Sequence, residues 1–271
     1  MAMVKVSELN IYPIKSAGQI SVLSARLDRF GLSNDRRWMV VDPAGRFITQ
    51  RELPRMSLLR IDLSDEKIKL AAPWMKPLAV PAYPAHGLIV EVSVWNDQCN
   101  AIDMGSRIAE WMSQFLGRAC RLVYMPESTR RPVNPEYGEA NDTVSFADGF
   151  PLLLISEASL AELSSRLGRA VEMNRFRPNI VVSGCEAFAE DDWNSIEING
   201  VEFNVATPCA RCSMPTIDQY TGQIDRSIMT TLGAFRRAED GHIYFGQNLI
   251  QQGDGKISVA DEVLVSGNEV N

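Results

Sequence analysis

The first third of the chain alternates hydrophobic and polar residues in short runs, a pattern typical of half-buried β-strands. The alternation is clearest over residues 4–12. Tight turns separate the runs, and Asp42-Pro-Ala-Gly45 has the proline and the glycine that favour a type I turn. Short strands joined by such turns predict a small barrel or sandwich. We expect these strands at residues 4–12, 38–41, 46–49, 58–63, 67–70 and 88–95.

A helical period replaces this alternation after residue 105. Apolar residues then recur on one face of a helix, at Ile108, Trp111, Met112, Phe115 and Leu116. Gly117 follows as a helix-ending residue, so the pattern predicts a helix over residues 106–117. A second helix is expected to begin with Ser156 as its N-cap and to run through Leu167.

The rest of the chain returns to strand patterns around a loop at residues 126–141. Asn199-Gly200 is a strong hairpin turn within residues 195–203. Further strands are expected at residues 120–124, 179–182, 244–245 and 257–265. Together these elements predict a β-rich α+β fold, in which a smaller N-terminal β domain packs against a larger C-terminal one.

Composition and charge narrow the class of protein. Hydrophobic residues make up 45% of the 271 residues and charged residues 23%, as in an ordinary globular protein. Apolar runs such as residues 151–155 are too short to cross a membrane, and the N-terminus lacks the apolar segment of a signal peptide. The net charge of -7 argues against a general nucleic-acid binder. We therefore expect a cytoplasmic protein with neither nucleic acid nor membrane as a partner.

The sharpest chemical signal is Cys209-Ala-Arg-Cys212. The odd total of five cysteines argues against a framework of disulfides. A zinc site or an iron–sulfur cluster would need further ligands close to this pair. A thioredoxin-like pair would open a helix, which Pro215 discourages. The remaining cysteines and histidines stand alone in the sequence: Cys99, Cys120, Cys185, His86 and His242.

Two interpretations of the pair stay open. Either both cysteines are loop residues without a chemical role, or one thiolate binds a soft metal whose other ligands come from a cofactor. Arg211 lies between the cysteines and would favour a thiolate. A cofactor would need anchors, and arginine and lysine suit its phosphate. The candidate anchors, each of which is equally typical of a solvated strand end, are Lys15, Ser16, Arg36, Arg37, Arg175 and Arg177.

In order and spacing, these residues resemble the MOSC-domain family. The resemblance rests on Tyr12-Pro-Ile-Lys-Ser16, Asp35-Arg-Arg-Trp38, Ser156-Glu-Ala-Ser159, Phe176-Arg-Pro-Asn179, Ser183-Gly-Cys185, Trp193, Cys209-Ala-Arg-Cys212, Asp218 and Thr221-Gly222. They are similar to the subgroup with an N-terminal MOSC β-barrel domain, the mitochondrial amidoxime-reducing components and their bacterial relatives. Molybdenum cofactor sulfurases share the CxRC pattern, but they add a large aminotransferase-like domain that we do not expect here.

The resemblance implies an N-terminal MOSC β-barrel-like domain over residues 1–120. This domain would pack on a MOSC β-barrel domain with flanking helices over residues 121–271. It also implies a mononuclear molybdenum cofactor, in which molybdopterin, oxo groups and Cys212 hold the metal. The same matching assigns cofactor binding to Lys15, Ser16, Arg36, Arg177, Asn179 and Arg211. The implied activity is two-electron reduction of small N-hydroxylated compounds, namely hydroxylamines, amidoximes and N-hydroxylated bases.

Two departures from the family pattern affect these expectations. Asp148-Gly149-Phe150 stands where many relatives have hydroxyl-bearing residues, so contacts to the cofactor there are expected to be backbone only, or absent. The sequence lacks the cysteine cluster of the ferredoxin domain that some bacterial relatives carry, so electrons are expected from a separate redox protein. The alternative functions are a non-redox carrier of the molybdenum cofactor, a sulfur carrier with a persulfide on Cys212, and a plain binding protein with incidental cysteines.

Overall fold

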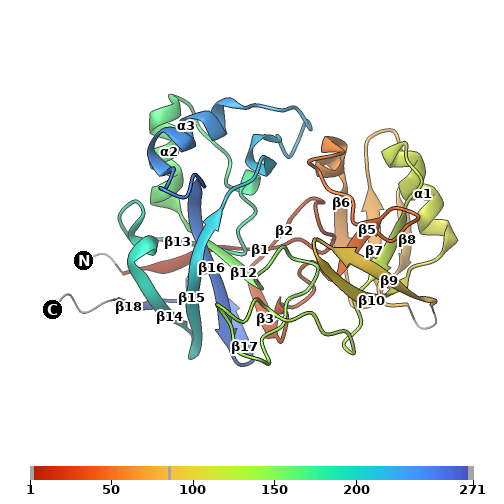
Figure 1. The fold of residues 1–271 in the computed structure, drawn as a ribbon, viewed down its shortest axis with the longest axis horizontal. Helices are drawn as coiled ribbons and strands as arrows, with labels where there is room; N and C mark the ends of the chain where they lie inside the picture. The colour runs from red at the N-terminus through yellow and green to blue at the C-terminus, as the bar shows by residue number, and fades with distance from the viewer. Residues whose placement is uncertain (1–2, 85–86, 268–271) are drawn as a thin grey trace.

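The computed structural model describes residues 3–84 and 87–267, and Figure 1 shows their arrangement. Met1, Ala2 and the candidate ligand His86 lie outside the described residues. The largest sheet has eight strands, which in spatial order are β18 (Val263–Gly267), β14 (Trp193–Ile198), β15 (Val201–Ala210), β16 (Tyr244–Gln252), β12 (Leu152–Ser156), β13 (Ile180–Ser183), β1 (Lys5–Ile11) and β2 (Ile20–Val22).

Three smaller sheets complete the β structure. The first has four strands, in the spatial order β5 (Trp38–Val41), β11 (Arg121–Tyr124), β10 (Asp97–Asp103) and β9 (Ile89–Val94). The second has three strands, β17 (Gly255–Ser258), β3 (Ser24–Asp28) and β4 (Gly31–Leu32). The third also has three, β6 (Arg60–Leu63), β7 (Lys67–Ala71) and β8 (Leu78–Pro81). The helices are α1 (Ser106–Leu116), α2 (Glu157–Leu167) and α3 (Ser227–Arg236), with 3₁₀ turns at Pro54–Leu58, Met173–Arg175, Ala189–Asp192 and Met214–Thr216. Figure 1 shows α2 beside α3 at one end of the large sheet, while α1 lies at the far side with the sheets that contain β11 and β8.

The sheets cross the boundary that was expected between residues 120 and 121. β1 precedes this boundary but pairs with β13 of the large sheet. β11 follows the boundary but pairs with β5, so that Tyr124 lies opposite Trp38. The division into residues 1–120 and 121–271 therefore stays a prediction about sequence domains, and it is not a division between sheets. One consequence is that the loop after β1 lies against the C-terminal half of the chain.

The predicted β-rich α+β fold is confirmed, together with both predicted helices. Gly117 ends α1 with a left-handed φ of 68°, and the Ser156 hydroxyl accepts a hydrogen bond from the Ser159 amide at the start of α2. One strand prediction was wrong, and another region contains two strands. Residues 46–49 form only isolated bridges, and residues 257–265 belong to two strands in different sheets, β17 and β18. No helix within residues 3–84 and 87–267 is long and apolar enough to span a membrane.

Trp38 is the largest of the fully buried side chains, and it ties β5 to its surroundings. Its indole N–H donates to the Ala82 carbonyl at 3.2 Å, and its ring lies 5.2 Å from that of Tyr124. Its own carbonyl accepts the backbone N–H of Lys15 at 2.8 Å. The packing of one core residue therefore positions a predicted site residue.

Replacing Trp38 by alanine is expected to lower the free energy of unfolding by about 3–5 kcal/mol, because it leaves a large cavity and removes the indole donor. Urea denaturation measures this loss. The same change at Trp74, which is 90% exposed, should stay within about 0.5 kcal/mol. Equal losses in the two variants would contradict this view of the core.

Candidate active site

Three predicted site residues share an uncommon backbone conformation. Ser16, Arg36 and Arg177 have φ values of 63°, 48° and 61°, in the left-handed region that residues other than glycine seldom adopt. Such conformations persist only where the surrounding structure enforces them, and they are concentrated at functional sites. The spacing of these residues in the sequence contains no signal for this geometry.

The buried carboxylate of Asp35 holds this backbone in place. One of its oxygens accepts the Tyr12 amide at 2.8 Å, and the other accepts Nη1 of Arg36 at 2.5 Å. The same Arg36 nitrogen donates to Oδ1 of Asn179 at 2.9 Å. Burial raises the pKa of Asp35, and the neighbouring Arg36 opposes this shift. Asp35 thus joins three segments that are far apart in the sequence.

The ring of Tyr12 lies under two guanidinium groups. The carbon centres of Arg36 and Arg177 are 4.3 and 4.2 Å from its centroid, a cation–π arrangement. The Tyr12 hydroxyl donates to the Pro178 carbonyl at 3.1 Å, and burial raises its pKa above the usual value. The aromatic face therefore accommodates two close cations without adding a charge of its own.

Two of the predicted cofactor-binding arginines keep buried donors without a partner among the described residues, as does Arg175. Arg177 donates through Nη1 to the Ala17 carbonyl at 2.7 Å, but its Nη2 has no acceptor. Arg211 donates through Nη2 to the Phe176 carbonyl at 2.7 Å, but its Nε has none. Buried polar atoms are nearly always paired, so these two nitrogens mark a place for an anionic or carbonyl-bearing ligand.

Lys15 is the third cation of the cluster. It is 5% exposed, and its ammonium donates to the Phe146 carbonyl at 2.7 Å and to Oδ1 of Asp148 at 2.5 Å. Burial lowers the pKa of Lys15 to about 8, although the Asp148 carboxylate acts in the opposite direction. The Asp148 carboxylate is exposed, and the Lys15 ammonium holds its pKa well below the usual value. The Asp148 side chain was not predicted as a site residue, because no more than backbone contacts was expected from residues 148–150.

A single cavity is lined by all the residues that the resemblance assigned to the cofactor: Lys15, Ser16, Arg36, Arg177, Asn179, Arg211 and Cys212. Asp148 and Cys209 also line it. Cys212 and Arg211 are in addition part of the wall of a larger open groove. Cys212 is exposed, so its sulfur lies where the cavity and the groove meet. The structure thus assembles these residues, and their roles toward a cofactor stay a prediction.

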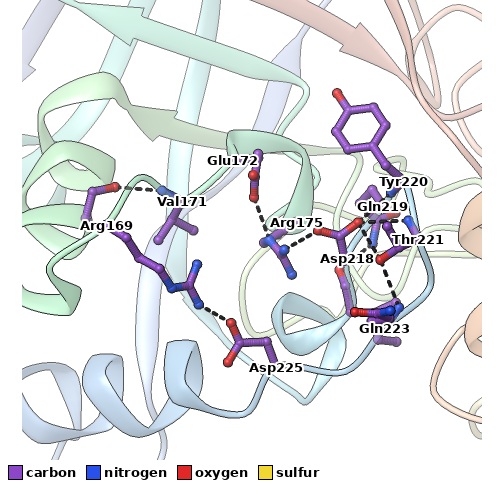
Figure 2. Close-up of polar contacts among 12 residues, drawn as sticks. Arg169, Val171, Glu172, Arg175, Asp218, Gln219, Tyr220, Thr221, Gln223 and Asp225 are labelled. Atoms are coloured by element: carbon purple, nitrogen blue, oxygen red, sulfur yellow. Dashed lines mark hydrogen bonds and ion pairs between the residues drawn. The ribbon is translucent and has the colours of Figure 1, made fainter.

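Two other candidate anchors lie outside this cavity. Arg37 is buried and donates to the Met125 carbonyl and to the Glu127 carboxylate, both at 2.7 Å. Figure 2 shows Arg175 between Glu172 and Asp218, with which it forms ion pairs of 2.8 and 2.5 Å. Both arginines therefore have structural partners, although each is only one or two residues from a cavity residue.

The loop after the CxRC segment is shaped by Asp218. Its carboxylate accepts the amides of Tyr220 and Thr221 at 2.9 and 2.8 Å, as Figure 2 shows. Burial would raise the pKa of Asp218, and these hydrogen bonds lower it below its usual value. Gln219, next in the chain, pairs its side-chain amide with that of Gln50 at 3.0 Å. The loop thus connects the CxRC segment to the N-terminal half of the chain.

The donor set of the cavity fits an anionic cofactor better than a metal ion held by protein ligands alone. Among the described residues, no three His, Cys, Asp or Glu side chains gather where they could hold a metal. A metal bound at Cys212 would therefore take its other ligands from outside this part of the chain. The orphaned nitrogens of Arg177 and Arg211, with the ammonium of Lys15, suit the phosphate and carbonyl oxygens of a pterin cofactor.

Comparison with known proteins agrees with the motif resemblance. Residues 3–119 match the MOSC N-terminal beta barrel domain, and residues 141–264 match the MOSC domain. Mitochondrial amidoxime-reducing component 1 of Mus musculus is 36% identical over 280 residues, which cover 97% of this chain and 82% of the relative. Mitochondrial amidoxime reducing component 2 of Rattus norvegicus is 39% identical over 243 residues, which cover 85% of this chain and 72% of the relative.

A more distant relative shares only part of its length with this chain. Molybdenum cofactor sulfurase of Bos taurus is 32% identical over 252 residues, which cover 85% of this chain but 29% of the sulfurase. The amidoxime-reducing components, in contrast, align over most of their own length. The chain therefore belongs to the MOSC-domain family, in the group with an N-terminal MOSC β-barrel domain that includes the mitochondrial amidoxime-reducing components.

Proposed function

We propose that this chain is a molybdenum-cofactor enzyme that reduces small N-hydroxylated compounds with electrons from a separate redox protein. The observation that carries the proposal is the position of Cys212, an exposed thiol between a basic cavity and an open groove. The names of the mouse and rat relatives support reduction of amidoximes. The proposal places the protein in the cytoplasm, where its five free cysteines would stay reduced.

In this proposal Cys212 is the protein's ligand to the metal, and the bound cofactor supplies the two-electron redox chemistry. Two donors reach the sulfur: Nη1 of Arg51 at 3.6 Å and the amide of Met214 at 3.5 Å. Donors of this kind stabilise and orient a metal-bound thiolate. The open groove on the other side of Cys212 leaves room for a substrate to approach.

The cavity residues would hold and orient the cofactor. Lys15, Arg177 and Arg211 supply the positive charge, and their positions are fixed by carbonyl and carboxylate partners. Asn179 and Ser16 complete the lining with polar groups. Because these side chains are already held in place, little conformational entropy would be lost when an anion binds.

Cys212→Ala is expected to abolish reduction of a hydroxylamine while the circular dichroism spectrum stays unchanged, because the proposed metal ligand is lost from an exposed position. Cys209→Ala is the matched control and should have a milder effect, since the Cys209 sulfur already lies 3.1 Å from Nη1 of Arg211. Turnover with an artificial electron donor measures both. Retained turnover in Cys212→Ala would rule out the assignment, and an inactive wild type with full cofactor content would favour the carrier alternative.

Arg177→Ala is expected to lower the pterin and molybdenum content of protein purified from a cofactor-competent host by about tenfold, because charge-assisted hydrogen bonds contribute about 1.5–3 kcal/mol each. Arg107→Ala, an exposed arginine on α1, should leave the content unchanged. Metal analysis and pterin fluorescence provide the two measurements. Normal loading of Arg177→Ala would contradict the anchoring role.

Cofactor uptake should weaken as the pH rises through about 8. The ammonium of Lys15 attracts an anionic pterin below its pKa of about 8 and is lost above it, so affinity falls on the alkaline side. Lys15→Arg keeps its charge over this range and should flatten the profile. Loading of the cofactor-free protein between pH 6 and 9 measures the effect, and an equally steep fall in Lys15→Arg would assign it to another group.

A further inference from the structure

The open groove beside Cys212 is strongly basic. We call it the basic groove, and it is lined by Arg51, Arg211, Cys212, Ser213, Thr216, Ile217, Ile224, Arg226, Met229, Thr230, Gly233, Ala234, Arg237 and Ile243. Its volume is about 900 Å³, which is in the range of small-molecule sites. Four of these residues are arginines, and none of the described lining residues is acidic. This charge contrasts with the net charge of -7 of the whole chain.

Helix α3 presents one face to the basic groove. The residues on this face follow the helical period, beginning just before the helix and ending just after it: Arg226, Met229, Thr230, Gly233, Ala234 and Arg237. Ile228 and Leu232 are buried on the other side of the helix. Small side chains thus occupy the middle of the face, and a guanidinium lies at each end. This arrangement leaves a shallow apolar floor bordered by positive charge.

Two acidic residues near α3, Asp225 and Asp240, are engaged elsewhere. Asp225 forms an ion pair with Arg169, which Figure 2 shows, and it also accepts the Ser227 hydroxyl at 2.6 Å. Asp240 accepts the His242 amide at 2.8 Å and the Tyr244 hydroxyl at 2.6 Å. These carboxylates therefore have their own donors and do not neutralise the groove arginines.

The four arginines differ in how far they are already occupied. Arg211 donates to the Phe176 carbonyl, Arg51 lies 4.6 Å from the ring centroid of Trp95, and Arg237 donates to the Gly241 carbonyl at 2.7 Å. The exposed guanidinium of Arg226, in contrast, has no hydrogen-bond or ion-pair partner within residues 3–84 and 87–267. Among the four arginines of the groove, Arg226 is therefore the one whose guanidinium donors are all available to bind a ligand.

We propose that the basic groove is a substrate site for N-hydroxylated compounds that carry a second, oxyanionic group such as a carboxylate or a phosphate. Arg226 binds the oxyanion, the exposed Ile224 contacts the body of the molecule, and the N–O end points toward Cys212. This inference rests on the proposed function and adds a substrate class to it. The concave shape and the apolar floor favour a small molecule over an acidic face of the electron-donor protein.

Binding of matched probes to the oxidised, cofactor-loaded enzyme tests the inference without turnover. The probes are 4-carboxybenzamidoxime, 4-phosphonobenzamidoxime and the neutral isostere 4-carbamoylbenzamidoxime. By calorimetry at low salt, at least one anionic probe should bind about fivefold more tightly than the amide, as expected for an ion pair at a partly exposed site. The tighter of the two anionic probes identifies the carboxylate or the phosphate class.

Variants assign the preference to a residue. Arg226→Gln should bring the affinities of the three probes together, Arg226→Lys should restore part of the difference, and Arg107→Gln should leave it unchanged as a control for net charge. Equal affinities in the wild type, or an unchanged preference in Arg226→Gln, would overturn the inference. It would also be overturned if Arg226→Gln changed only the KM for the electron-donor protein, because the groove would then face that partner.

The neutral probe separates this inference from the proposed function. Reduction of 4-carbamoylbenzamidoxime with an artificial electron donor depends on the cofactor and Cys212, and it needs no anionic group on the probe. If this probe is reduced and no anionic preference exists, the substrate class is wrong while the proposed function holds. If none of the probes is reduced by fully loaded protein, the proposed function itself fails.

Discussion

The site depends on one electrostatic constraint, the gathering of like charges at largely buried positions. Lys15, Arg36, Arg177 and Arg211 line the same cavity. Burial lowers the pKa of Lys15 to about 8 and that of Arg177 to about 10, and Arg36 adds to the shift at Arg177. These shifts mean that the charged forms are disfavoured there. An anion in the cavity would stabilise the charged forms of Lys15 and Arg177, so the arrangement fits a ligand that carries a phosphate.

The protein tolerates these charges because fixed partners surround them. Asp35 neutralises Arg36 at 2.5 Å, and the Tyr12 ring offers its negative face to two guanidinium groups. Strand exchange between the two halves of the chain makes this possible. β1 pairs with β13, and the Asn10 amide donates to the Asn179 carbonyl at 2.9 Å, so the loop that follows β1 meets residues 177–179. The cavity is therefore a product of the sheet topology.

The sequence predicted the elements whose own residues form a clear pattern, such as a periodic apolar face or a glycine at the end of a helix. α1 has a continuous apolar face and a glycine at its end, and β5 is a short apolar run next to a turn. α3 was missed because its sequence has two adjacent threonines, an isoleucine and a glycine, which are weak helix formers, so packing of Ile228 and Leu232 decides its structure. Residues 46–49 contain the aromatic and β-branched side chains typical of a strand but form only isolated bridges. In both segments, contacts with residues that are distant in the sequence decide the structure.

In the site, too, the sequence motifs predicted which segments contribute but not which side chain of each segment lines the cavity. The motifs located the candidate anchors, but neighbours in the sequence have different partners: Arg36 lines the cavity, while Arg37 donates to Met125 and Glu127. The two cysteines differ for a similar reason. Cys209 lies within β15, beside a bulge between Pro208 and Ala210, whereas Cys212 follows the end of the strand. Bulges redirect side chains and end strand pairing. Cys212, which lies beyond the sheet, lines both the cavity and the groove, whereas Cys209 lines the cavity and not the groove.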